Sequence, residues 1–339
     1  MFPQDMQLPG EDWIFSWYVI FFAMFCGGVI AFKQYMKGAP CQSTERVKGK
    51  TIIITGANSG MGKETAKELL KRGARVILAC RDVEKGEEAV NDIKEQLRKK
   101  ELNAVVMKLD LSSFISVREF AKEFLKNESK LDVLINNAGV ILLPERILSK
   151  DGFEMQLASN YLGHFLLTHL LLDRLESSAP SRIINMSAVA YQLADDIDLE
   201  DMNYENKEYN RSNAYAQSKL AVLLFTREMS RILEGTKVTV NAVHPGVVNS
   251  PGLRHMPFKS SPFLSLSFTL PIWYFTKSSK DGAQTTIYLA VASDVETVSG
   301  KFFVECAEKE VTENACNDDL AKKLYGKSLE WTGLNKKTK

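Results

Sequence analysis

Short apolar runs rich in β-branched residues alternate along this chain with longer amphipathic stretches. The short runs predict strands at residues 51–55, 74–80, 104–110, 131–136, 182–187 and 237–243. Charged stretches between them, such as residues 83–99 and 115–127, have the period of a helix. Strands that are buried on both faces and joined by helices form a parallel sheet covered on both sides. The pattern therefore predicts an α/β fold, a Rossmann-like doubly wound parallel sheet in a single domain.

An uncharged apolar run precedes this pattern. It extends from Trp13 to Phe32, and these 20 residues form a helix of about 30 Å, the thickness of the hydrocarbon layer of a bilayer. Residues 1–12 contain acidic residues but no Lys or Arg, whereas a cleaved signal peptide begins with a positive stretch. We expect residues 13–32 to be a retained transmembrane helix that anchors the protein.

The charges behind this run predict how the anchor is oriented. Most charged residues that follow it are basic: Lys33, Lys37, Arg46, Lys48 and Lys50 against Glu45. Basic flanks stay on the cytoplasmic side of a membrane. We therefore expect a luminal N-terminus at residues 1–12, a basic linker at 33–48 and a cytosolic domain at 49–310. Residues 311–339 are expected to form a C-terminal helix and a basic tail.

The overall composition excludes some classes of function. The chain has 43 Lys and Arg against 42 Asp and Glu, so it lacks the basic surplus of a nucleic-acid binder. Its five cysteines are odd in number and have no paired spacing, which indicates reduced thiols. Its four histidines have no metal-ligand spacing. We expect neither nucleic acid nor a metal ion as a partner.

A glycine-rich turn directly follows the first predicted strand. Glycines allow a tight turn and a close approach of the backbone to a pyrophosphate, whose charge the following helix N-terminus stabilises. The position between a strand and a helix predicts a dinucleotide site. Its candidate cofactor-binding residues are Gly56, Asn58, Ser59, Gly60, Met61 and Gly62.

The end of the second strand distinguishes between two cofactors. An NAD enzyme usually carries an acidic residue there for the ribose 2′-hydroxyl, whereas Arg81 offers the charged fork that suits a 2′-phosphate. The sequence predicts NADP (NADPH) rather than NAD, although a solvated Arg81, partly neutralised by Asp82, is the alternative. Asp110 ends the third strand, where it could reach the adenine or cap the following loop.

Three motifs in order carry a family resemblance. They are TGANSGMG at 55–62, NNAG at 136–139 and YAQSK at 215–219, and together they resemble the short-chain dehydrogenase/reductase family over residues 49–310. Further segments resemble its retinol dehydrogenase 11–14 branch, among them DGFEMQ at 151–156, LGHFLLTHLLL at 162–172 and HPGVV at 244–248.

The third motif suggests the chemistry. Tyr215 and Lys219 lie four residues apart, so they share one face of a helix. An ammonium group nearby stabilises a phenolate, and we expect it to lower the pKa of Tyr215, the candidate general acid/base. The resemblance implies that Lys219 contacts the nicotinamide ribose and that Asn160 holds a water of the proton relay. It implies further cofactor contacts for Asn137, Ala138, Gly139, Pro245, Gly246, Val248 and Ser250.

The chain departs from its relatives after the fifth strand. Relatives carry two serines there, and the second binds the substrate oxygen; here the pair is Ser187 and Ala188. Losing such a donor costs roughly a hundred- to a thousand-fold in turnover. Ser187 could substitute, which makes it a candidate catalytic residue, or Tyr215 could work with less help. We favour a working enzyme over a catalytically weak, membrane-bound binding protein.

The segment at 257–277 is apolar and contains no acidic residue. Its large side chains are Phe258, Phe263, Leu264, Phe268, Leu270, Ile272, Trp273 and Phe275. The resemblance implies that this region covers the substrate, and a location beside membrane lipid suits a lipophilic alcohol or aldehyde. An ordinary amphipathic lid or a contact in a homo-oligomer is the alternative.

The resemblance also bears on substrate and organelle. It implies retinol and retinal as substrates, with reduction favoured by NADPH; other lipid aldehydes and steroids stay open. The endoplasmic reticulum is favoured over a mitochondrial membrane because residues 1–12 lack the Arg-rich character of a transit peptide.

Overall fold

The structure, a computed structural model, describes residues 11–194, 197–249 and 274–335. It contains an eight-stranded sheet with the order β3-β2-β1-β4-β5-β6-β7-β8. The strands are β1 (Thr51–Thr55), β2 (Arg75–Cys80), β3 (Ala104–Lys108), β4 (Val133–Asn136), β5 (Ser181–Met186), β6 (Val238–His244), β7 (Phe302–Val304) and β8 (Ala307–Glu308). Pairing is parallel from β3 to β7, and β8 is antiparallel. The predicted doubly wound parallel sheet is confirmed, and its six predicted strands are all present.

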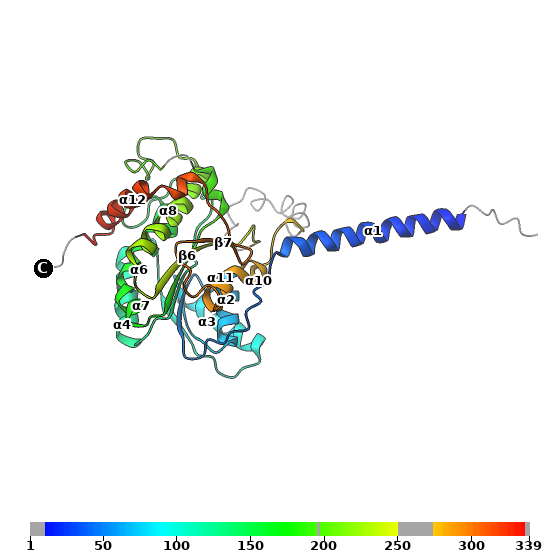
Figure 1. The fold of residues 1–339 in the computed structure, drawn as a ribbon, viewed down its shortest axis with the longest axis horizontal. Helices are drawn as coiled ribbons and strands as arrows, with labels where there is room; N and C mark the ends of the chain where they lie inside the picture. Colours follow the sequence, from blue (N-terminus) through cyan, green and yellow to red (C-terminus); the bar gives the residue numbers. More distant parts are fainter. Residues whose placement is uncertain (1–10, 195–196, 250–273, 336–339) are drawn as a thin grey trace, which may run out of the picture.

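Helices cover both faces of the sheet (Figure 1). On one face lie α2 (Gly60–Lys71), α3 (Val83–Leu97), α10 (Ser279–Gly282) and α11 (Gln284–Val291). On the other lie α4 (Phe114–Asn127), α6 (Gly163–Leu170), α7 (Leu172–Ser177), α8 (Arg211–Ile232) and α12 (Asp318–Trp331). Strand β1 shows why two cores form. Successive side chains point to opposite faces of a strand, so Ile52 and Ile54 pack under α2 whereas Ile53 packs in the other core.

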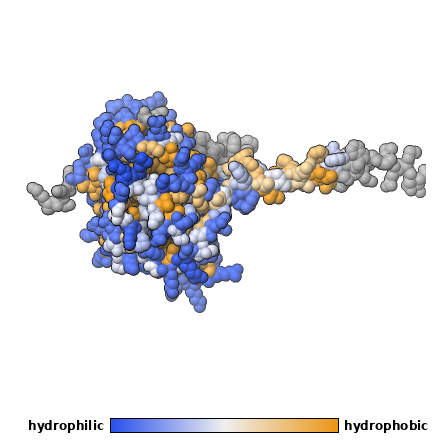
Figure 2. Space-filling view, in the orientation of Figure 1, coloured by the Kyte–Doolittle hydropathy of each residue, from blue (hydrophilic) through white to orange (hydrophobic). Residues whose placement is uncertain are grey.

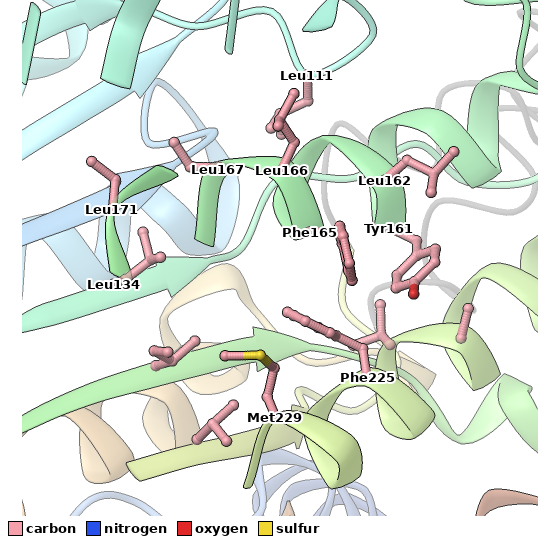
Figure 3. Packing of buried hydrophobic residues seen from close by; sticks show 14 of the residues in the cluster. Leu111, Leu134, Tyr161, Leu162, Phe165, Leu166, Leu167, Leu171, Phe225 and Met229 are labelled. Carbon is pink, nitrogen blue, oxygen red and sulfur yellow. The ribbon is translucent and has the colours of Figure 1, made fainter. Parts of the chain in front are cut away.

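The core under α6 and α8 fixes the helix that carries Tyr215 and Lys219. Aromatic side chains from the two helices face one another in Figure 3, and the ring centroids of Phe165 and Phe225 are 5.1 Å apart. Helix α12 covers this core from outside, where the hydroxyl groups of Tyr161 and Ser328 form a buried hydrogen bond of 2.7 Å. This packing fixes the position of α8 relative to β5 and β6.

Helix α1 (Glu11–Lys37) projects away from the rest of the structure (Figure 1). Within the described residues, Trp17–Lys37 is the one helical segment long and apolar enough to cross a membrane. Most of its large apolar side chains are exposed, which excludes a buried core helix, and Figure 2 shows hydrophobic colour along much of its length.

The base of α1 is held against the domain. The ring of Phe32 stacks on Tyr274 at 5.0 Å, and Lys33 Nζ donates to the carbonyl oxygen of Thr276 at 2.8 Å. Helix α1 is therefore joined directly to residues 274–276, near the end of the predicted apolar segment. The rest of that segment, from Pro257 to Trp273, lies outside the described residues, as does Ser250.

Candidate active site

A cavity of about 900 Å³ opens at the carboxyl ends of the parallel strands. The chain leaves β1 toward β2 on one side and later returns to β4 on the other, and ligands of doubly wound sheets bind at this reversal. All of the predicted cofactor-binding residues within the described residues line this cavity: Gly56, Asn58, Ser59, Gly60, Met61, Gly62, Arg81, Asp110, Asn137, Ala138, Gly139, Tyr215, Lys219, Pro245, Gly246 and Val248. The three sequence motifs therefore meet around one space.

The glycine turn brings the N-terminus of α2 to the cavity, where an anion could bind. Gly56 and Gly60 have φ angles of +67° and +57°, which residues with side chains rarely adopt. A Cβ on Gly62 would lie 2.5 Å from the carbonyl oxygen of Gly56 and 2.7 Å from Asn137 Nδ2. Helix α2 begins at Gly60, its N-cap Ser59 makes no side-chain capping bond, and its first turn has no acidic residue. Free amide groups and the helix dipole at this end suit the pyrophosphate of a dinucleotide.

Thr55 ties the NNAG loop to the end of β1. Its hydroxyl oxygen accepts from the amides of Asn137 and Ala138, both at 2.9 Å, and Asn137 Nδ2 donates to the Thr55 carbonyl at 2.8 Å. Asn137 Oδ1 is buried without a partner among the described residues. An unsatisfied buried acceptor beside a cavity is what a bound ligand with a donor group would complete.

His164 connects this loop to the next helix. Its Nδ1 lies 3.1 Å from the carbonyl oxygen of Asn160, and its Nε2 lies 2.9 Å from the hydroxyl of Thr55. A carbonyl only accepts, so Nδ1 carries the proton and Nε2 accepts from Thr55. Burial lowers the pKa of His164 to about 4, so the ring is neutral. His164 could not be identified from the sequence, since its partner Thr55 lies 109 residues away along the chain.

Arg81 is exposed and lines the cavity just after the end of β2. The carboxylate of Asp82 caps α3 and pairs with Lys85 at 3.0 Å, so it is engaged with another cation. Lys63 also lines this end and pairs with Asp92. Lys63 and Lys85 are thus paired with carboxylates, and Arg81 is the cation there that is best placed to bind a phosphate.

Asn160 lies in a π-helical turn at Ala158–Leu162, a rare widening that often occurs at functional sites. Its Oδ1 accepts from the amide of Val140 at 2.8 Å, and its Nδ2 donates to the Val140 carbonyl at 3.0 Å and to Ser218 Oγ at 2.9 Å. Ser218 Oγ in turn donates to the carbonyl of Tyr215 at 2.7 Å. Asn160 is buried behind the cavity wall and joins the NNAG loop to α8, while its predicted role toward a water stays a prediction.

Tyr215 and Lys219 lie on one face of α8, as their spacing predicts. Lys219 Nζ donates to the carbonyl of Met186 at 2.9 Å and lies 5.7 Å from the centroid of the Tyr215 ring. Burial lowers the pKa of Lys219 to about 8. Burial also raises the pKa of Tyr215, which is opposite to the lowering expected from its neighbouring ammonium. The ring keeps some exposure to the cavity, but the surrounding protein makes an anionic phenolate costly.

A tyrosine with a raised pKa is protonated at neutral pH. It can therefore donate a proton to the oxygen of a carbonyl compound, and the lysine beside it supports the negative charge left behind. A nicotinamide dinucleotide, when bound, would supply or accept the hydride. The side chains of Ile141, Val189 and Val247 add apolar surface to the same cavity.

Ser187 does not present its hydroxyl proton to the cavity. Its Oγ donates to the carbonyl of Lys219 at 2.9 Å, and its amide donates to the carbonyl of Val243 at 2.9 Å. This arrangement ties β5 to α8 and holds Lys219 in place. The neighbouring Ala188 lines the cavity with a methyl group, so the serine hydroxyl that the family resemblance implies at this position is absent.

Comparisons with known proteins agree with this geometry. A family model described as short chain dehydrogenase matches residues 50–197 and 202–257. The chain is 48% identical to retinol dehydrogenase 13 of Mus musculus over 308 residues, covering 91% of each protein. It is 46% identical to retinol dehydrogenase 12 of Homo sapiens over 302 residues, covering 89% of this chain and 92% of that protein.

Solved structures are similar as well. An uncharacterized protein from Mycobacterium Paratuberculosis is 34% identical, with a TM-score of 0.67, covering 87% of this chain and 98% of that one. The Pseudomonas aeruginosa RhlG/NADP active-site complex is 25% identical, with a TM-score of 0.59, covering 76% of this chain and 95% of that one.

Proposed function

This chain belongs to the short-chain dehydrogenase family of NAD(P)-using oxidoreductases, and we propose that it is an NADP(H)-dependent enzyme interconverting a lipophilic alcohol and its aldehyde. Retinol and retinal are the proposed substrates, and reduction of retinal is the proposed direction. The observation that carries the proposal is the meeting of Tyr215, Lys219 and the glycine turn around one cavity. The retinol dehydrogenases at 46–48% identity support the substrate.

The preference for NADP rests on Arg81. Its guanidinium borders the cavity at the end of β2, and the carboxylate of Asp82 is engaged by Lys85. A charge-assisted hydrogen bond contributes about 1.5–3 kcal/mol, roughly ten- to a hundredfold in affinity. Arg81→Asp should therefore weaken NADPH binding by at least about tenfold and leave NADH binding equal or tighter. Arg98→Asp, the same charge change at an exposed site away from the cavity, is the control; equal losses in both variants would refute the role of Arg81.

The proposed location is a membrane, most simply the endoplasmic reticulum, with α1 as a single-pass anchor and the domain in the cytosol. Exposed apolar side chains along α1 and the basic residues at its end support this orientation. A cytosolic domain would have access to NADPH, which favours reduction. Fractionation of cells with protease protection tests both points, since a mitochondrial fraction or a protected domain would contradict them.

The direct test is NADPH oxidation by the detergent-solubilised protein. The protein is assayed with retinal, a steroid ketone and an alkenal, beside Tyr215→Phe as the inactive control. We expect retinal-dependent oxidation in the wild type alone, and faster turnover of retinal than of the other two compounds. A wild type that binds NADPH but oxidises it with none of them would overturn the proposal, and a preference for steroid or alkenal would reassign the substrate.

A second candidate is a catalytically weak protein that binds nucleotide and lipophilic ligand. The methyl group of Ala188 favours it, because a donor found in relatives is missing there. Binding of NADPH and retinal without turnover, together with activity gained by Ala188→Ser, would select this candidate.

A further inference from the structure

A different hydrogen-bond donor borders the place where the serine hydroxyl is absent. His244 ends β6, the strand that pairs with β5, and the amide of Ser187 donates to the carbonyl of Val243 just before it. His244 lines the cavity together with Ala188 and Tyr215. These neighbours put a histidine ring beside the site of the missing side chain.

The hydrogen bond at one ring nitrogen determines the tautomer. The amide of Val189, the residue after Ala188, donates to His244 Nδ1 at 3.4 Å. An amide only donates, so Nδ1 is the unprotonated nitrogen. Burial, helped by Lys277, lowers the pKa of His244 to about 4, and the neutral ring carries its single proton on Nε2.

The Nε2 proton of His244 has no acceptor among the described residues. His244 Nε2 makes no hydrogen bond to any part of the chain that the structure describes, and it is not among the buried atoms that lack a partner. A donor that has no partner and is not fully buried, on a residue that lines the cavity, is available to a ligand.

We propose that the Nε2 proton of His244 donates a hydrogen bond to the substrate carbonyl oxygen and so replaces the missing serine hydroxyl. The inference rests on the proposed carbonyl reduction. In that reaction the carbonyl carbon gains a hydride from the dinucleotide, and the π electron pair moves to the oxygen. The oxygen then takes the proton of Tyr215, while His244 keeps its own proton throughout. A fixed donor aimed at the developing negative charge lowers the barrier.

Two substitutions separate this role from a merely structural one. The amide oxygen of Asn in His244→Asn can still accept from Val189 near the position of Nδ1, but no donor remains at Nε2. His244→Gln places an amide donor near Nε2 and loses the acceptor. We expect kcat to fall roughly a hundred- to a thousandfold in His244→Asn and far less in His244→Gln, with little change in KM. The reverse order would overturn the proposal.

Serine supplies the decisive comparison. Adding Ala188→Ser to His244→Asn returns a hydroxyl to the position that relatives use, so it should restore most of the lost kcat. Ala188→Ser alone should change the wild-type kcat only a few-fold, because His244 already provides the donor. His244→Leu, alone and with Ala188→Ser, gives a second pair with the same expected rescue. Loss of activity in both pairs without rescue by serine refutes the assignment.

Measurements other than turnover keep this inference distinct from the proposed function. Calorimetric binding of NADPH should stay near wild type in all His244 variants, as in the control His169→Asn. The unfolding temperature should stay near wild type in His244→Asn, which keeps an acceptor for the amide of Val189. His169 is a partly buried histidine on α6 that is hydrogen-bonded to Tyr325 and lies away from the cavity. An inert wild type that binds NADPH overturns the proposed function, whereas an active wild type with an equally active His244→Asn overturns the role of His244 alone.

Discussion

Gly62→Ala is the sharpest test of the glycine turn, because the same change has opposite expected effects at two helical glycines. Gly62 lies in the first turn of α2, and an added Cβ would meet the carbonyl oxygen of Gly56 at 2.5 Å and the Cα of Ala57 at 3.0 Å. Both are backbone atoms, which cannot rotate away. The Cβ would also press on Asn137 Nδ2, which donates to the carbonyl of Thr55.

The magnitude follows from three contributions. Replacing a helical glycine by alanine stabilises a helix by about 1 kcal/mol. Crowding in a packed site costs about 1–3 kcal/mol, and weakening the hydrogen bond of Asn137 costs about 1 kcal/mol more. The net expectation for Gly62→Ala is a loss of about 1–3 kcal/mol, or a fall in Tm of roughly 2–12 °C at 2–4 °C per kcal/mol.

The matched control is Gly326→Ala. Gly326 lies inside α12, and a Cβ there would meet nothing within 4 Å. It should gain the helix term alone, about 1 kcal/mol, so Tm should rise by a few degrees. Thermal unfolding and NADPH titration are measured on both variants, and we expect Gly62→Ala to lose at least tenfold in affinity while Gly326→Ala binds as the wild type. Equal stabilisation of both variants, with NADPH binding kept, would refute the close-packed turn.

Three further expectations concern the candidate site and helix α1. Tyr215→Phe should lower kcat by roughly a hundred- to ten-thousandfold with NADPH binding kept, as measured by steady-state kinetics and calorimetry; turnover within tenfold of wild type would exclude it as the acid. Burial lowers the pKa of Lys219 from 10.5 to about 8, so the unfolded chain binds one proton more between these values. Relative to Lys219→Met, the free energy of unfolding of the wild type should therefore rise by about 3 kcal/mol from pH 8 to pH 10.5, and a flat difference in denaturant titrations would contradict that burial. Phe32→Ala removes an aromatic pair worth about 1 kcal/mol, so amide hydrogen exchange at residues 274–277 should quicken roughly fivefold, and unchanged exchange would argue against docking of α1.

The parallel sheet could be predicted because its strands carry their own signal. Runs such as Thr51–Thr55 are buried on both faces, so nearly every position is apolar or β-branched. Strand β7 has only three residues, Phe302–Val304, and its pairing with β6 comes from the tertiary fold. The π-helical turn at Ala158–Leu162 also had no signal, since an extra residue in a helical turn changes the backbone and not the side-chain pattern.

Residues of the candidate site that belong to local motifs could also be predicted, whereas those that depend on distant contacts could not. Glycines and the Tyr215–Lys219 spacing specify local chemistry, so the sequence identified residues that the structure brings together. The predicted direction of the Tyr215 pKa shift was wrong. The burial that raises this pKa depends on the whole fold, and it outweighs the charge of the lysine four residues away. His244 was missed because its partner Val189 lies 55 residues away. The signal that could have found it is its place before Pro245 and Gly246, where the loop enters the cavity.

The short junction between α1 and the domain has a kinetic consequence. Phe32 and Lys33 contact Tyr274 and Thr276 directly. The proposed anchor would therefore hold the cavity close to the membrane surface. For the proposed lipophilic substrate, encounter with the enzyme would then take place in the two dimensions of the bilayer. The relevant quantity would be the mole fraction of substrate in the bilayer. Diluting proteoliposomes with buffer of the same NADPH concentration should leave the velocity per enzyme unchanged, whereas adding inert phospholipid to the same membrane should lower it.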